Sequence, residues 1–252
     1  MFLEEIEQIT FSAQEKIRKL EKNKFRYYVL SGLGGIYVCF GALLSLNISG
    51  LLMESLYGRI LANASFGIAL CLIVMAGGEL FTGNHLVMSI ATLHKQVSLR
   101  KTFKLWLYCF LGNGIGVLLF SLLLSAGDFI QGNVSIVLQQ FVSAKLKLNL
   151  FSVFIRAFLC NMLICAAIWI TYRSKNEVAK LLIIFLCVFT FTTCALEHSV
   201  ADMAYLSFAF FSSMEGFRPL LSLYFLAVVS LGNLLGGVIG IALPYWYISS
   251  ED

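Results

Sequence analysis

Six long apolar stretches divide the chain, at about residues 25–46, 60–94, 102–126, 149–172, 180–212 and 219–248. Each reaches the roughly 20 residues that an α-helix needs to cross a bilayer. The second and fifth stretches are too long for one simple crossing, and polar residues interrupt both of them. The pattern predicts an all-α membrane protein with six transmembrane helices, of which the second and fifth are broken.

The two interruptions match each other. A shift of 118 positions places Glu79 on Glu197 and Asn84 on Asp202. An ionisable residue at a membrane helix centre costs ~2.5–3.5 kcal/mol, so it usually faces an internal cavity or pathway. We expect the two glutamates to accept hydrogen bonds from backbone donors that the breaks expose, and Asn84 and Asp202 to cap the half-helices that follow. Equivalent interruptions in two halves of a membrane protein also point to a binding site near the midplane.

A second internal match supports a duplication. Gly112-Asn113 in the third stretch corresponds to Gly232-Asn233 in the sixth, with an offset of 120. Each half has three crossings, which is an odd number, so the second half starts on the opposite side of the membrane. The second half must therefore be inverted relative to the first. The predicted architecture is a single channel domain at 25–248 with 3+3 inverted repeats, at about 25–126 and 149–248.

Residues 1–24 are predicted to form an amphipathic N-terminal helix in the cytoplasm. Its apolar positions recur at spacings of three and four residues, with Glu and Lys between them; they are Phe2, Ile6, Ile9, Ala13, Ile17 and Leu20. This apolar face could lie on the membrane interface or pack against a neighbouring subunit. Residues 249–252 are expected to form a short cytoplasmic tail.

Composition agrees with a membrane protein and sets its orientation. The chain is 59% hydrophobic and 13% charged, whereas soluble domains average about 25% charged residues. With six crossings, thirteen lysines and arginines fall on the side of the termini and four on the other side, namely Arg59, Lys145, Lys147 and Arg218. Both termini are therefore predicted to be cytoplasmic. This bias accounts for the net charge of +4, so no nucleic-acid partner is implied.

The residues of the interruptions provide the candidate chemistry. His198 lies beside Glu197, and the ordinary pKa of histidine near 6.5 allows hydrogen-bond donation and proton exchange. Phe81 and Phe191 flank the two interruptions and are candidates for a pore constriction. All seven cysteines lie in apolar stretches without metal-ligand spacing, so we predict buried thiols, no disulfide, no metal and no cofactor.

Several segments together resemble one transporter family. Glu197-His198-Ser199-Val200-Ala201-Asp202-Met203 is similar to an E-H-S-x-A-N-M signature, and Leu80-Phe81-Thr82 matches the L-F-T of a broken second span. Cys160-Asn161-Met162-Leu163, Gly112-Asn113 and the run from Gly232 to Gly237 match further segments. Over essentially the whole chain, the sequence resembles the formate–nitrite transporter family.

The resemblance implies an aquaporin-like protomer in a bacterial plasma membrane, assembled as a homopentamer with one pore per subunit. Family members pass small monovalent anions of weak acids, such as formate, nitrite, hydrosulphide, acetate or lactate. Their pores have two hydrophobic constrictions with a histidine between them. The branch that this sequence resembles most is the hydrosulphide channels.

The resemblance also assigns roles to individual residues. His198 would be the central histidine, and Phe81 and Phe191 would line the constrictions. Lys145, which alone reads as a solvated loop lysine, would attract the anion at the outer vestibule. The polar residues of the pore would be Thr82, Glu197, Asn161, Asn233 and Ser98, the last in a loop within reach of the histidine.

Departures from the family pattern and two rival functions remain. Asp202 replaces the usual asparagine, and Gly83-Asn84-His85 replaces a segment rich in Ser and Thr. A neutral-solute channel of the aquaporin or ammonia type would share the inverted repeat, but the two Asn-Pro-Ala boxes are absent and Pro219 and Pro244 lie elsewhere. An intramembrane enzyme would need a nucleophile or metal set beside His198, and the sequence shows neither, so we expect a non-enzyme.

A reporter fused to the C-terminus is expected to lie in the cytoplasm, because the cation count favours that side by thirteen to four. Accessibility of the reporter to a membrane-impermeant reagent measures its side. An external C-terminus would imply an odd number of crossings and would contradict the 3+3 repeat.

Overall fold

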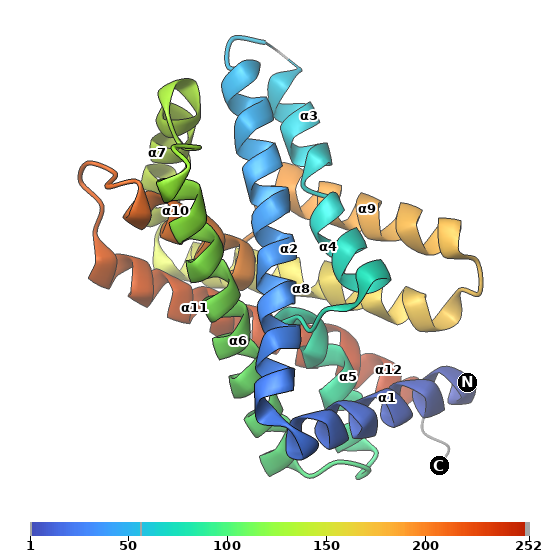
Figure 1. Cartoon of the computed structure of the whole chain (residues 1–252). Coiled ribbons are helices and arrows are strands. Elements are labelled where there is room, and N and C mark those ends of the chain that lie inside the picture. Colours follow the sequence, from blue (N-terminus) through green and yellow to red (C-terminus); the bar gives the residue numbers. More distant parts are fainter. Residues whose placement is uncertain (1, 56, 250–252) are drawn as a thin grey trace.

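The computed structural model describes residues 2–55 and 57–249, and within them the regular structure is entirely helical (Figure 1). The elements are α1 (Leu3–Lys22), α2 (Lys24–Leu51), α3 (Gly58–Ser65), α4 (Ile68–Leu72), η1 (Ile73–Gly77), α5 (Phe81–Leu93), α6 (Leu99–Ala126), α7 (Gly132–Leu146), α8 (Leu150–Arg173), α9 (Glu177–Thr193), α10 (Ser199–Phe211), α11 (Pro219–Gly237), η2 (Val238–Ala242) and α12 (Leu243–Ser249). The segments η1 and η2 are π-helical turns.

Both predicted breaks are present. The chain leaves helical geometry between Gly77 and Phe81, and again between Thr193 and Ser199. Among the described residues, five continuous helices are long and apolar enough to cross a membrane: α2, Gly58–Gly77, α6, α8 and Pro219–Ser249. The helix α9 has 17 residues and the half-helices α5 and α10 have 13 each, so the structure establishes the broken helices but not the count of six crossings.

Two tight helix pairs form the frame, since α2 packs on α6 and α8 packs on α11. Glycines set their spacing. A Cβ added at Gly116 of α6 would lie 2.1 Å from the Gly32 carbonyl oxygen, and one at Gly236 of α11 would lie 2.0 Å from that of Phe158. Small residues allow such close approach of helix backbones. The two half-helices then pack against this frame, α10 on α6 and α5 on α8.

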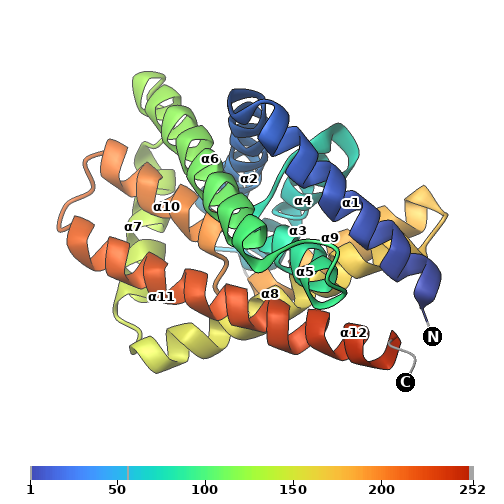
Figure 2. The same cartoon turned by 90° about the horizontal axis from the view of Figure 1, so that it is seen from below.

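The N-terminal helix packs on its own chain. Its predicted stripe of Ile6, Ile9, Ala13, Ile17 and Leu20 is buried, and its main neighbour is the half-helix α5. Figure 2 shows α5 between α1 and α12, and α1 also contacts α12. The expectation that this stripe faces lipid or another subunit is therefore wrong, because α5 already covers it.

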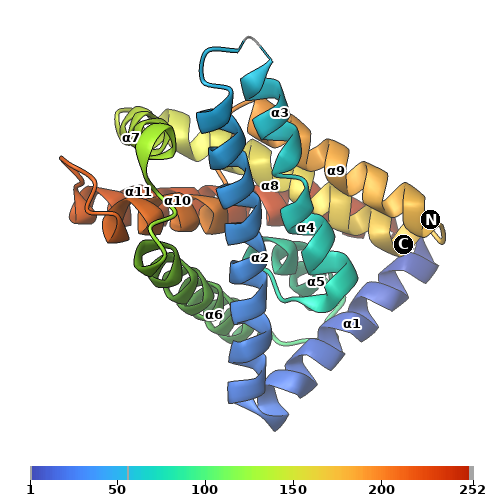
Figure 3. The same cartoon turned by 45° about the horizontal axis from the view of Figure 1, so that its top comes forward.

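The segment between the predicted repeats contains a further helix, α7, which packs against α2 and α10. It resembles α1 in its place: each of the two precedes a long helix and contacts the half-helix of its own half. On the other side of α2, α3 and α4 lie between α2 and α9, and α9 runs beside α8 (Figure 3). The runs α1–α6 and α7–α12 thus have a similar order of elements, and they are called the first and the second half. The predicted tail at 249–252 lies outside the described residues except for Ser249.

Replacing Gly116 with alanine is expected to destabilise the protein by about 1–3 kcal/mol, because the added methyl group would overlap the backbone of α2. Gly114→Ala is the matched control on the same helix, since its Cβ would meet only the Met203 sulfur at 3.4 Å. Thermal unfolding of the detergent-purified proteins compares the two. Equal midpoints would show that backbone contact at Gly116 does not set the spacing of α2 and α6.

Candidate functional site

The first break is closed by one asparagine from a neighbouring helix. Asn113 of α6 accepts a hydrogen bond from the Phe81 backbone N–H at 2.9 Å. Its side-chain amide donates to the carbonyl oxygens of Glu79 at 2.8 Å and Ser31 at 2.7 Å. A backbone that leaves its helix in an apolar interior needs such partners, so Asn113 satisfies the polar groups that the break exposes.

The second break repeats this arrangement with Asn233 of α11. Its side-chain oxygen accepts from the Ser199 N–H at 2.8 Å, and its amide donates to the carbonyls of Glu197 at 2.9 Å and Ala157 at 2.8 Å. The expected caps, Asn84 and Asp202, do not perform this role. They lie one turn into the half-helices, where the Asn84 side chain contacts Glu79 and the Asp202 side chain contacts Lys145.

Glu79 holds a buried charge that is paired with the N-terminal helix. Lys16 of α1 donates to both carboxylate oxygens, at 2.6 and 2.7 Å, and Asn84 and Tyr27 donate to Oε2 at 2.8 and 3.3 Å. Burial lowers the pKa of Lys16, but the charge of Glu79, the nearby Tyr172 and the hydrogen bond to Glu79 together raise it more, so its pKa lies above the ordinary value. The backbone does not supply the partners of this carboxylate, contrary to expectation.

Lys16 was not among the predicted site residues, because it pairs with a residue 63 positions later. The signal available was the unpaired Glu79 itself, since a buried carboxylate requires a cation.

Glu197 has the corresponding partner in Lys145 of α7. The Lys145 ammonium contacts Glu197 Oε2 and lies 2.8 Å from Asp202 Oδ1. Burial lowers its pKa, and the carboxylates of Asp202 and Glu197 raise it above the ordinary value. The Lys145 side chain is only 11% exposed, so the expectation of an open cation at the vestibule needs correction. Two carboxyl groups already contact its ammonium group.

His198 lies directly before α10 and is held on both ring nitrogens. Nδ1 accepts a hydrogen bond from the Ala201 backbone N–H at 3.2 Å, and Nε2 lies 2.8 Å from the Thr82 hydroxyl. Because Nδ1 is an acceptor, the ring proton of the neutral imidazole resides on Nε2, which donates to Thr82. The structure thereby brings together His198 and Thr82, which the sequence analysis placed in one pore.

A cavity of about 920 Å³ ends at this histidine. Its lining comes from α2, α3, α7, α9 and α10, and includes Phe191, Lys145, Glu197, His198 and Asp202. The Phe191 ring is stacked on the His198 ring with centroids 5.7 Å apart. Both side chains are about 4% exposed, so the inner end of the cavity is a closed aromatic wall.

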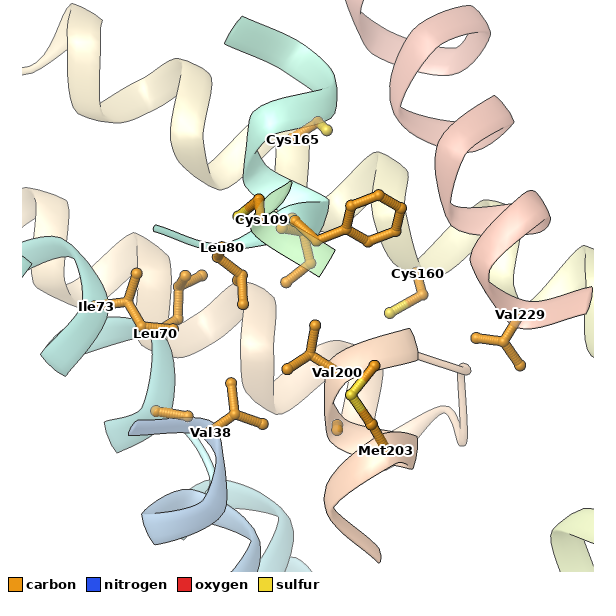
Figure 4. Packing of buried hydrophobic residues seen from close by; sticks show 14 of the residues in the cluster. Val38, Leu70, Ile73, Leu80, Cys109, Cys160, Cys165, Val200, Met203 and Val229 are labelled. Atoms are coloured by element: carbon orange, nitrogen blue, oxygen red, sulfur yellow. The ribbon is translucent and has the colours of Figure 1, made fainter. Parts of the chain in front are cut away.

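Phe81 lies away from this cavity lining. Its ring packs on Phe110 and His85, with centroids 4.9 and 4.4 Å apart. Figure 4 shows the apolar packing around the breaks, where Leu80 lies with Leu70 and Ile73, and Val200 lies near Met203. Phe81 and Phe191 thus belong to separate aromatic clusters.

Asn161 of α8 links the half-helix α5 to α11. Its amide nitrogen donates to the Asn233 carbonyl at 2.7 Å, lies 2.9 Å from His85 Nδ1, and is 3.4 Å from the Thr82 carbonyl. His85 is fully buried and was not among the predicted site residues. Its place one turn after Thr82 on the same helix was the available signal.

Ser98 does not reach the histidine. It is exposed, caps the N-terminus of α6 by accepting from the Lys101 N–H at 3.4 Å, and lines a separate surface pocket beside α1. The hydroxyl next to His198 is that of Thr82. The prediction failed because the loop after α5 runs back over the surface.

The cysteines and possible metal ligands require one correction. All seven cysteines are free, but Cys194 is exposed, because the second break carries it out of the helix. No group of three His, Cys, Asp or Glu side chains within residues 2–55 and 57–249 could hold a metal ion.

The whole of this architecture matches one family. The family model described as formate/nitrite transporter matches residues 4–247. The chain belongs to the formate/nitrite transporter family. It is 32% identical to the nitrite transporter NirC of Salmonella typhimurium, over 100% of this chain and 94% of that protein. It is 27% identical to the formate channel BtFdhC of Bacillus thuringiensis, over 91% and 89% of the two chains.

Solved structures agree with this assignment to the formate/nitrite transporter family. An ion channel of the family superimposes with a TM-score of 0.91 and 29% identity, covering 98% of this chain and 99% of the other. A pentameric formate channel with formate bound shares the fold, with a TM-score of 0.78 and 21% identity over 90% and 98% of the chains. The cavity and the broken helices thus belong to a membrane transport protein.

Lys145→Ala is expected to destabilise the folded protein by about 3–5 kcal/mol, because it leaves two buried carboxyl groups without their cation. Lys147→Ala is the control, since Lys147 is exposed on the same segment and surface substitutions usually stay within about 0.5 kcal/mol. Thermal unfolding in detergent gives both values. Equal unfolding temperatures would mean that Lys145 contributes no structural ion pair.

Proposed function

We propose that this protein is a homo-oligomeric membrane channel for small monovalent anions of weak acids, with nitrite and formate as the first candidates and hydrosulphide as the third. Each protomer contains one pore and crosses the membrane six times, as 3+3 inverted repeats with cytoplasmic termini. The matched closure of the two breaks by Asn113 and Asn233 supports the repeat. The full-length similarity to a nitrite transporter and to formate channels supports the substrate class.

The observation that carries the proposal is the cavity that ends on His198 and Phe191. An anion is costly in an apolar passage unless it is paired or neutralised. At the end of the cavity the anion can replace the Thr82 hydroxyl as the acceptor of the hydrogen bond from the Nε2–H of His198. Phe191 on the cavity side and Phe81 in its separate cluster act as the two constrictions that exclude water and bulky solutes.

The remaining polar residues position this centre. Asn161 and Asn233 fix the two half-helices, and Glu197 holds Lys145 at the cavity wall. Lys145 forms the vestibule charge, but together with Glu197 and Asp202 rather than as an isolated cation. The proposed chemistry is transport without bond-breaking in the substrate.

The exterior of the protomer supports a membrane-embedded oligomer. Along one face of α6, apolar side chains are exposed from one turn to the next, including Leu107, Leu111, Ile115, Leu118 and Leu122. Such a continuous apolar surface requires lipid or a second subunit to cover it. The fold shared with a pentameric channel favours a pentamer in the plasma membrane.

Stopped-flow measurements on proteoliposomes test the function. Inward gradients of nitrite, formate and hydrosulphide are expected to give protein-dependent uptake, and an osmotic gradient is expected to give no protein-dependent water flux. Water or ammonia flux without anion uptake would instead establish a neutral-solute channel.

His198→Phe is expected to reduce anion flux about tenfold or more, since a hydrogen bond to a charged group contributes ~1.5–3 kcal/mol, and to change the pH profile of uptake. His94→Phe is the control, because His94 follows α5 and lies near Trp246, outside the cavity lining. Uptake is measured between acidic and alkaline pH, with size-exclusion chromatography to verify assembly. Unchanged flux and an unchanged profile in an assembled His198→Phe protein would remove the histidine from the mechanism.

A further inference from the structure

The two charged clusters at the breaks differ by one group. In the first half, the amide of Asn84 donates to Glu79 Oε2 at 2.8 Å, and Lys16 balances the carboxylate. In the second half, the equivalent position is Asp202, which has no N–H to donate. Lys145 therefore contacts two carboxyl groups where Lys16 contacts one.

The second cluster contains one positive charge and two groups that can be negative. Asp202 is 1% exposed, and its Oδ2 atom has no hydrogen-bond donor among the described residues. An ionised oxygen without a donor is strongly disfavoured in a buried site. Two carboxyl groups that share a site commonly hold one proton between them.

We propose that Asp202 and Glu197 share one proton, held on Asp202 Oδ2, and that this carboxyl group protonates the weak-acid anion that enters the cavity. Asp202, Glu197 and Lys145 all line the cavity, so the cluster borders the space that the anion would enter. Storage of the proton depends only on the cluster, whereas its delivery to an anion rests on the proposed function.

His198 is not suited to be this donor. Its Nδ1 accepts the Ala201 N–H, so the neutral ring carries a single proton on Nε2. Giving up that proton would leave an imidazolate, and gaining a second would break the cap of α10. His198 therefore donates a hydrogen bond, and the proton comes from the carboxyl pair next to it.

The groups that surround Asp202 favour one stored proton. Lys145 approaches from α7 and Glu197 and His198 from the break, while Tyr205 follows on α10 and Cys160 faces the cluster from α8. Lys145 provides the only full positive charge in this set. It balances one carboxylate, and the second carboxyl group is neutral when protonated.

The transfer balances in protons and charge. The O–H bond of Asp202 breaks as an O–H bond forms on an oxygen of nitrite or formate, and the neutral acid passes the aromatic wall. Asp202 is left as a carboxylate beside Lys145 and regains a proton from water in the cavity. The acid releases its proton on the far side, so each cycle moves one anion and one proton.

Infrared spectroscopy of the membrane-reconstituted full chain tests the stored proton directly. At neutral pH the wild type is expected to show the carbonyl stretch of a protonated carboxylic acid, and Asp202→Asn is expected to lose it. This variant reproduces Asn84, so its amide can donate to Glu197 and the fold is retained. Asn84→Asp, the matched control, is expected to add a second protonated-acid band.

The absence of the band from the wild type, or its persistence in Asp202→Asn, would overturn the stored proton. Neither result would affect the proposed transport function.

Proteoliposome uptake tests delivery of the proton. The wild-type rate of formate uptake is expected to stay constant as the external pH rises towards neutrality. The rate for Asp202→Asn is expected to fall about tenfold per pH unit, because it follows the concentration of formic acid in solution. Superimposable profiles in the two proteins would overturn delivery. If the wild type transports none of the anions although the infrared band behaves as expected, the proposed function fails and the stored proton stands.

Discussion

The fold depends on satisfying backbone polar groups where two helices break inside an apolar interior. A helix that stops there exposes N–H and C=O groups with no water to bind them. Asn113 and Asn233 each bond two of these groups, and each donates a third hydrogen bond to a carbonyl of a neighbouring long helix. They reach the breaks because the helices lie close together: a Cβ at Gly34 would be 2.2 Å from the Glu79 carbonyl oxygen. Close packing at the glycines therefore allows the asparagine side chains to bond the backbone at the breaks.

The two halves differ in the polar residues at their breaks. The halves share the asparagine closure and a glutamate paired with a lysine. At the last residue before the half-helix, however, Leu80 in the first half corresponds to His198 in the second. One turn later, the amide of Asn84 corresponds to the carboxyl group of Asp202. A common frame thus carries a leucine and an amide in one half, and a histidine and a carboxyl group in the other.

Sequence patterns predicted the features that depend on local order. The two breaks, the internal match and the apolar stripe of α1 follow from hydropathy and spacing, and the structure contains each of them, although the stripe packs within its own chain. The partners across the structure could not be predicted in this way. Asn84 and Asp202 resemble helix caps by position, but a neighbouring helix occupies that role. The offset of 118 would place Lys145 on Tyr27 and not on Lys16, because the connections in the two halves differ in length. Ser98 was misplaced because spacing does not determine where a loop runs.

The pairing of Lys16 with Glu79 has a consequence for biogenesis. Glu79 follows Lys16 by 63 residues. The ribosome therefore completes α1 long before it adds Glu79. Lys16 is therefore made before the carboxylate that it pairs with, and α1 must remain beside the membrane until Glu79 and α5 are in place. Docking of α1 then compensates the buried charge as a late step of maturation. An N-terminal fusion that restrains α1 would interfere with this step and expose the unfinished protein to quality-control proteases.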